Sequence, residues 1–147
     1  MEPTPQMLRE LAAAAMAVKS HAYAPASYFA VGAAVLADDG RSFAGCNVEN
    51  ASYGLTICAE RAAVFAAVAA GAKVLRAVAI ATDLAKPARP CGACRQVLAE
   101  FGRDMVVMLV GTGGLTERTT LGALLPEPFT FADLDRYRSA KGTSASS

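Results

Sequence analysis

The chain has 147 residues, which is the size of one ordinary domain and is long enough to fold without disulfides or a structural metal. Its 14 basic and 13 acidic residues are scattered along the sequence and give a net charge of +1. This pattern disfavours a nucleic-acid partner, which would require a concentrated basic patch. Hydrophobic residues make up 54% of the chain, but none of the apolar runs approaches the roughly 18 residues of a membrane span, so we expect a soluble protein with no membrane partner.

The N-terminal segment lacks the basic region and apolar run of a signal peptide. We therefore expect a cytoplasmic protein whose cysteines are free or bound to metal. The sequence predicts a single domain over residues 1–138, followed by a tail over 139–147 that is expected to be disordered.

The first predicted helix begins at Thr4 and Pro5, a hydroxyl cap followed by proline in the first turn, and runs to about residue 21. Aromatic and β-branched residues predict a strand over 28–36. A turn at 38–40 then leads into a second strand over 42–48, so that the two strands form a hairpin.

A second helix is predicted over 58–70, with Gly71 as its C-terminal stop, and a third helix begins at the second cysteine pair and ends near residue 101. Apolar strands are predicted over 77–82 and 105–110. Three short elements are predicted to follow: a strand at 116–119, a helical turn at 121–125 and a last helix at 131–137. This order predicts an α/β layered structure with a mixed sheet.

Two short cysteine segments carry the strongest chemical signal. Cys91 and Cys94 are spaced by about one helical turn and can reach one metal, while Cys58 arrives from a facing helix. All three lie at predicted helix N-termini, where backbone N–H groups and the helix dipole stabilise thiolates. Three thiolates leave one corner of a tetrahedral zinc ion open for water, which predicts one catalytic Zn²⁺ per chain.

Glu60 lies two residues from the first cysteine and is the candidate proton carrier. A carboxylate there could take a proton from water, pass it to a ring nitrogen and later protonate a departing amine, as hydrolytic deamination requires. Arg61 and Gln96 are each two or three residues from a cysteine. We expect both to donate hydrogen bonds to sulfur and to offset the negative charge of the site.

Other interpretations remain open at this point. A Cys-x-x-Cys pair by itself also fits a redox motif or a structural zinc knuckle. Cys46 could close the site as a fourth ligand, although a small, buried apolar role is expected for it. A zinc-stabilised binding module without turnover and an editing enzyme acting on single-stranded nucleic acid are the competing functions.

From residue 23 to about 134 the chain resembles the small, homotetrameric cytidine deaminases. The motifs that carry the resemblance occur in the family's order and spacing, and they are Tyr23-Ala24-Pro25, Phe29-Ala30-Val31-Gly32-Ala33, Gly45-Cys46-Asn47-Val48-Glu49-Asn50-Ala51, Cys58-Ala59-Glu60-Arg61, Pro90 to Gln96, and Leu124-Leu125-Pro126 with Phe129. The resemblance implies a three-layer α/β/α fold with a mixed, roughly five-stranded sheet. It also implies that the three cysteines named above bind zinc and that Glu60 is the catalytic proton shuttle.

The resemblance further implies the substrate-binding residues. Asn47 and Glu49 would hydrogen-bond the ribose 3′-hydroxyl, Phe29 would pack on the pyrimidine, and the backbone N–H of Ala59 would help to hold the base. Tyr53 is a further substrate-binding candidate.

The implied reaction converts cytidine and 2′-deoxycytidine to uridine and 2′-deoxyuridine and releases ammonia, as in pyrimidine salvage. In the implied homotetramer Phe129 would reach the active site of a neighbouring subunit. Ala26 departs from the family, which usually has tyrosine there. Deaminases of blasticidin S share the zinc signature but differ at the ribose motif around Asn47, so a free nucleoside is the favoured substrate.

Overall fold

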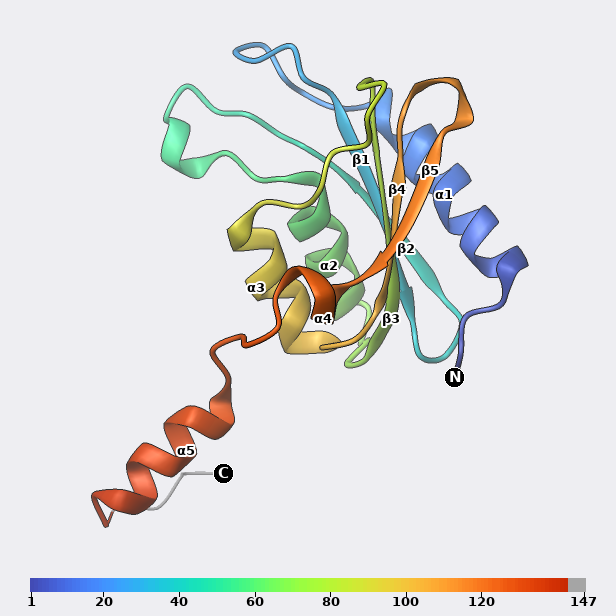
Figure 1. Cartoon of the computed structure of the whole chain (residues 1–147). Coiled ribbons are helices and arrows are strands. Elements are labelled where there is room, and N and C mark those ends of the chain that lie inside the picture. The colour runs from blue at the N-terminus through green and yellow to red at the C-terminus, as the bar shows by residue number, and fades with distance from the viewer. Residues whose placement is uncertain (143–147) are drawn as a thin grey trace.

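A five-stranded sheet forms the centre of the computed structural model, which describes residues 1–142 (Figure 1). The strands follow the order β2-β1-β3-β4-β5 and are β1 (Val31–Ala37), β2 (Ser42–Cys46), β3 (Leu75–Thr82), β4 (Val106–Val110) and β5 (Thr116–Thr120). β3 and β4 pair in parallel and the other neighbours pair antiparallel, so the sheet is mixed.

Helices cover both faces of the sheet. α1 packs on one face against β1 and β3, while α2 and α3 lie side by side on the other face (Figure 1). The helical elements are α1 (Pro5–Lys19), η1 (Tyr53–Leu55), α2 (Ala59–Ala69), α3 (Gly92–Phe101), η2 (Thr112–Gly114), α4 (Leu121–Leu124) and α5 (Phe131–Ala140). This arrangement confirms the predicted three-layer α/β/α architecture.

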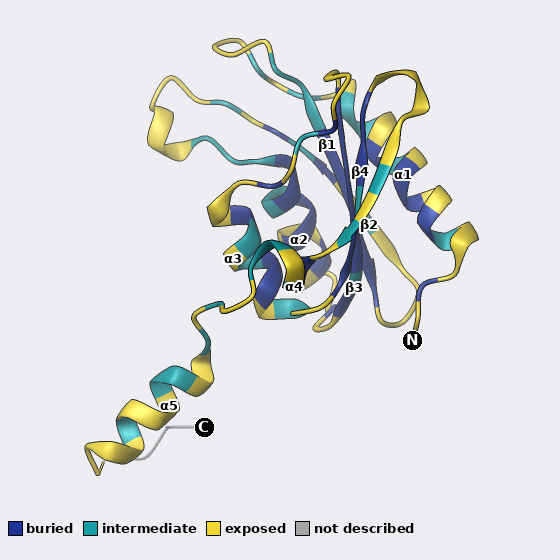
Figure 2. Cartoon of the chain, viewed as in Figure 1, coloured by how far each residue is buried: buried dark blue, intermediate teal, exposed yellow. Residues whose placement is uncertain are grey.

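Two hydrophobic clusters hold the layers together, one between the sheet and α1 and one between the sheet and the α2–α3 pair. Figure 2 shows the central strands as the most buried part of the fold. α2 approaches the sheet very closely, because a Cβ atom at Gly45 would lie 2.5 Å from the backbone nitrogen of Ala63. The backbone of β2 therefore fixes the position of α2 and of the cysteine that precedes it.

The first strand begins at Val31, three residues later than predicted. Residues 24–28 form a turn instead, in which the backbone N–H of Tyr28 donates to the carbonyl oxygen of Ala24 at 2.9 Å. Tyr28 has a φ of 58°, a left-handed conformation that no strand residue adopts. The local hydrogen bonds of this turn override the β propensity of its aromatic residues.

α5 continues to Ala140, two residues into the segment that was predicted as a tail, and residues 143–147 of that segment lie outside the described part of the chain. Thr130 and Asp133 form a capping box at its start. The helix projects away from the three layers (Figure 1). Within residues 1–142, the structure contains no helix that combines the length and the apolar character needed to cross a bilayer.

Candidate active site

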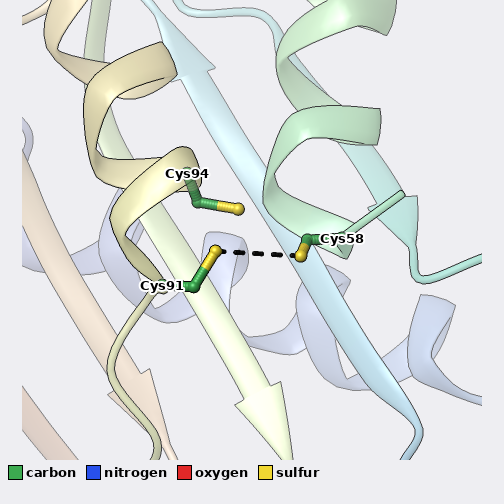
Figure 3. A group of neighbouring side chains, drawn as sticks. All are labelled: Cys58, Cys91 and Cys94. Carbon is green, nitrogen blue, oxygen red and sulfur yellow. Dashed lines mark hydrogen bonds between the residues drawn. The ribbon is translucent and has the colours of Figure 1, made fainter. Parts of the chain in front are cut away.

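Three cysteine thiols from two helix starts meet on the α2–α3 side of the sheet. Cys58 is the N-cap residue of α2, Cys91 is the N-cap residue of α3, and Cys94 follows in the first turn of α3. Their Sγ atoms all lie within 4.8 Å of one another, and those of Cys58 and Cys91 are 3.9 Å apart (Figure 3).

This donor set fits zinc. With Zn–S bonds of about 2.3 Å, two sulfurs on a tetrahedral zinc ion are separated by about 3.8 Å, close to the spacing observed here. The cysteine cluster found among residues 1–142 has three members, and Cys46 on β2 is not one of them. The geometry therefore favours a site with three protein ligands over a closed four-cysteine site.

Arg61 lies beside this cluster on the first turn of α2. Its Nη2 atom donates to the Sγ atom of Cys58 at 3.4 Å, as expected from the sequence. The hydrogen bond to Cys58 raises the pKa of Arg61 above its usual value, and a second one to Cys94 adds to the effect. The buried Nε atom of Arg61 has no hydrogen-bond partner among the described residues, so the guanidinium retains one unused donor.

The prediction for Gln96 needs correction. Its Nε2 atom donates to the backbone oxygen of Phe129 at 2.8 Å rather than to a cysteine sulfur. The reason is geometric, because two residues along an α-helix turn the side chain by about 200° away from Cys94. Its neighbour Arg95 donates to the carbonyl oxygens of Pro90 at 2.8 Å and Leu124 at 3.0 Å. These two side chains thus tie α3 to the C-terminal segment.

Glu60 is buried, with 5% of its surface exposed. Burial raises the pKa of its carboxyl group, although hydrogen bonds from its own backbone and from Cys94 partly oppose the shift. Burial likewise raises the pKa of the Cys94 thiol. For Cys91, hydrogen bonds from Cys94 and Cys58 outweigh the effect of burial, and its pKa lies below the usual value.

A cavity of about 300 Å³ opens beside the thiols and brings most of the predicted site together. Its lining includes two of the cysteines and five other residues singled out from the sequence, namely Phe29, Asn47, Glu49, Ala59 and Glu60. These residues come from four separate segments of the chain, so the fold assembles one pocket from them.

Two further polar side chains of the cavity lining, those of Asn47 and Glu49, are held by hydrogen bonds to the backbone. Asn47 is 8% exposed, accepts from the backbone N–H of Val31 at 2.8 Å and donates to the carbonyl oxygen of Phe29 at 2.7 Å. Glu49 accepts from the backbone N–H groups of Ala26 at 2.9 Å and Ser27 at 3.1 Å. The Ser27 hydroxyl also donates to it, and these hydrogen bonds lower the pKa of Glu49.

Two of the predicted substrate-binding residues lie outside this cavity. Tyr53 is 77% exposed and lines a neighbouring surface pocket, which it shares with Glu49. Phe129 is 62% exposed and follows α4. Neither side chain lines the cavity of the chain that carries it.

Sequence reasoning missed four polar residues of the lining, which are Ser27, Thr56, Thr82 and Arg89. Thr82 ends the apolar run of β3 and is 3% exposed, so a polar residue at the end of a buried strand was an available signal. Arg89 donates to Glu117 of β5 at 3.1 Å, a partner 28 residues away. Its position depends on tertiary structure and left no local signal.

Comparison with known proteins agrees with this geometry. A family model described as "Cytidine and deoxycytidylate deaminase zinc-binding region" matches residues 5–110. The chain is 46% identical over 128 residues to the cytidine deaminase of Sporosarcina psychrophila, covering 86% of this chain and 94% of that protein. It is 48% identical over 117 residues to the cytidine deaminase of Mycobacterium tuberculosis strain H37Rv, covering 80% of this chain and 85% of that protein.

Solved structures give the same result. The crystal structure of cytidine deaminase from Burkholderia pseudomallei superposes with a TM-score of 0.79 at 48% identity, covering 82% of this chain and 98% of that chain. The family model matches most of the sequence, and the matches to relatives with nearly 50% identity cover almost the full length of those relatives. The chain therefore belongs to the cytidine and deoxycytidylate deaminase zinc-binding family.

Proposed function

We propose that this protein is a zinc-dependent hydrolase that converts cytidine and 2′-deoxycytidine to uridine and 2′-deoxyuridine and releases ammonia. One observation carries the proposal: three cysteine sulfurs within 4.8 Å of one another adjoin a cavity whose lining includes the buried carboxyl group of Glu60. The relatives described above are named cytidine deaminases, which supports the same reaction.

The thiolates of Cys58, Cys91 and Cys94 would hold the zinc ion. When bound, zinc lowers the pKa of water from 15.7 to about 7 in favourable sites and so supplies hydroxide at neutral pH. The N-termini of α2 and α3 stabilise the negative charge of the thiolates. Arg61 removes part of the remaining charge through its hydrogen bond to Cys58.

Glu60 would move the protons. Its carboxylate accepts a proton from water and transfers it to N3 of the pyrimidine as hydroxide adds to C4. It then carries the hydroxyl proton to the exocyclic amine, which leaves as ammonia. Burial suits this role, because it raises the pKa of the carboxyl group and so makes the carboxylate a stronger base.

The rest of the cavity would hold the nucleoside. Phe29 packs on the pyrimidine, the backbone N–H of Ala59 holds the base, and Asn47 and Glu49 bind the ribose 3′-hydroxyl. All four residues line the cavity. Glu49 is suited to accept a hydrogen bond from a hydroxyl group, because its lowered pKa keeps it ionised at neutral pH.

We also propose that the chain acts as a single domain in a cytoplasmic homotetramer, in which Phe129 serves the active site of a neighbouring subunit and Tyr53 contributes to substrate binding. The exposure of both aromatic side chains and the projection of α5 from the body support an interface (Figure 1). The four cysteines are free in the structure, as expected in a reducing compartment. Light scattering of the purified protein tests the oligomer, and a monomer that is fully active at all dilutions would contradict it.

The test of the reaction is the loss of ultraviolet absorbance when cytidine is added to purified protein of measured zinc content. The wild type should turn cytidine over. Glu60→Gln should keep the metal and lose about 10²–10⁴-fold in kcat, because it removes the acid–base group alone. Zinc-loaded wild-type protein that leaves cytidine and deoxycytidine unchanged would refute the proposed function.

A further inference from the structure

The segment 24–30 reaches the cavity without support from a helix or strand. It carries Phe29 into the lining, and just before this residue Tyr28 adopts its left-handed backbone conformation. Such conformations persist where the surroundings impose them, and they cluster at binding sites. A small set of hydrogen bonds holds this segment in place.

Glu49 supplies most of them. Its Oε1 atom accepts two backbone N–H groups, those of Ala26 and Ser27, and its Oε2 atom accepts the hydroxyl of Ser27. The Ser27 oxygen in turn accepts the backbone N–H of Phe29 at 3.0 Å. Because the ionised Glu49 carboxylate can only accept, the hydroxyl proton of Ser27 points at Glu49.

This pattern has a consequence for the free positions of the carboxylate. An ionised carboxylate offers about four acceptor positions, two on each oxygen. Both positions on Oε1 of Glu49 are taken by the loop, and one on Oε2 is taken by Ser27. The remaining acceptor position lies on Oε2, so the Ser27 hydroxyl determines which direction is left for a ligand.

We propose that Ser27 is a positioning residue for sugar recognition: its hydroxyl holds the Glu49 carboxylate so that the free acceptor position of Oε2 meets the ribose 3′-hydroxyl. The proposal rests on the proposed function, because it takes a nucleoside as the ligand of the cavity. Ser27 acts on the sugar through Glu49, and its effect should therefore depend on the hydroxyl that Glu49 binds.

The experiment compares cytidine with 3′-deoxycytidine, which lacks that hydroxyl, in the zinc-loaded enzyme. For Ser27→Ala we expect kcat/KM for cytidine to fall about 10-fold, mainly through KM, because a charge-assisted contact is weakened. The value for 3′-deoxycytidine should change less than about 2-fold, since water can replace the hydroxyl in this exposed loop. Ser27→Thr keeps a hydroxyl and should recover most of the cytidine activity.

Ser42→Ala is the matched control, because Ser42 is also exposed but lies at the far end of β2, about 13 Å along the strand from Cys46. It should leave both substrates unaffected. An equal loss on cytidine and 3′-deoxycytidine in Ser27→Ala would overturn the proposal, since the serine would then be structural only.

A double-variant cycle gives a second, independent test. If Ser27 acts through Glu49, then Ser27→Ala should lower cytidine activity no further in a Glu49→Ala background. If the two substitutions instead lower cytidine activity by independent factors that multiply in the double variant, the proposal is overturned. Zinc content and folding are measured for each variant, so a loss caused by poor folding is recognised as such. Failure of the wild type on cytidine would instead refute the proposed function itself.

Discussion

The cavity has two sides that are built in different ways. We call the residues Cys58, Glu60 and Cys91 the metal side, and the residues Ser27, Asn47 and Glu49 the sugar side. The metal side stands on the first turns of α2 and α3, which pack on the sheet through a continuous hydrophobic cluster. The sugar side consists of connecting segments that are held mainly by hydrogen bonds between side chains and backbone.

This difference indicates how the two sides should respond to change. Positions on the metal side are fixed by close packing, which tolerates little displacement and transmits strain. Positions on the sugar side are fixed by individual polar contacts, each of which contributes about 0.5–1.5 kcal/mol, so a single loss is local. Substitutions of the thiols should therefore affect the metal and the fold together, whereas those on the sugar side should change substrate preference.

The largest effect is expected from Cys94→Ala. This change removes a buried thiol from the cluster of three, and two remaining thiolates cannot hold zinc in the same geometry. We expect loss of zinc, measured by metal analysis, together with loss of cytidine deamination. Cys46→Ala is the matched control, because Cys46 lies outside the cluster, and it should retain both metal and turnover.

Arg61→Ala tests a smaller contribution on the same side. The guanidinium donates to the Cys58 sulfur, and contacts of this kind alter activity by about 10–100-fold. We expect zinc to be retained while kcat falls within that range. Arg61→Lys should recover only part of the rate, because lysine keeps the charge but not the planar set of donors. Unchanged turnover at saturating cytidine would show that Arg61 has no such role.

A pair of glycine substitutions compares close packing beneath α2 with an open position in a connecting segment. A Cβ atom at Gly45 would collide with the backbone of α2, whereas one at Gly54, in the η1 segment, would meet no atom within 4 Å. Gly45→Ala should lower the free energy of unfolding by about 1–3 kcal/mol and weaken zinc binding. Gly54→Ala should stay within about 0.5 kcal/mol in the same denaturant titration. Equal effects of the two substitutions would show that the close packing at Gly45 does not hold α2 in place.

Tyr28→Asn should have the smallest effect. Asparagine tolerates the left-handed conformation better than tyrosine, and the Tyr28 side chain is 87% exposed. We expect the free energy of unfolding to rise by about 0.5 kcal/mol, with little change in cytidine kinetics. A loss of stability in thermal or chemical unfolding would show that the tyrosine side chain contributes more than its backbone strain costs.

The metal side could be predicted well from the sequence because its signals are local. Cys91 and Cys94 share one helical turn, and the apolar runs that carry α2 and α3 follow directly after the cysteines. The layered fold could be predicted for the same reason, since each strand and helix has its own hydrophobic pattern.

The sugar side could be predicted only in part. Asn47 and Glu49 were found by resemblance, but the contacts of Ser27 with Glu49 span 22 residues and leave no periodic signal. The strand predicted from residue 28 begins only at Val31, because the hydrogen bond from Tyr28 to Ala24 forms a turn before it. Gln96 shows a related limit, because closeness in sequence to Cys94 did not give the direction in which its side chain points.

Cys58 and Cys91 each have two possible roles for one side-chain atom, because the sulfur lies at the N-cap of a helix and also in the metal-binding cluster. Neither thiol makes the side-chain hydrogen bond that normally closes an N-cap position. Serine would close it better, by about 0.5–2 kcal/mol, yet serine is a poor zinc ligand. Replacing either residue with serine would therefore stabilise the start of the helix but lower zinc affinity and catalytic activity. A screen for thermal stability alone would select against catalysis at these two positions.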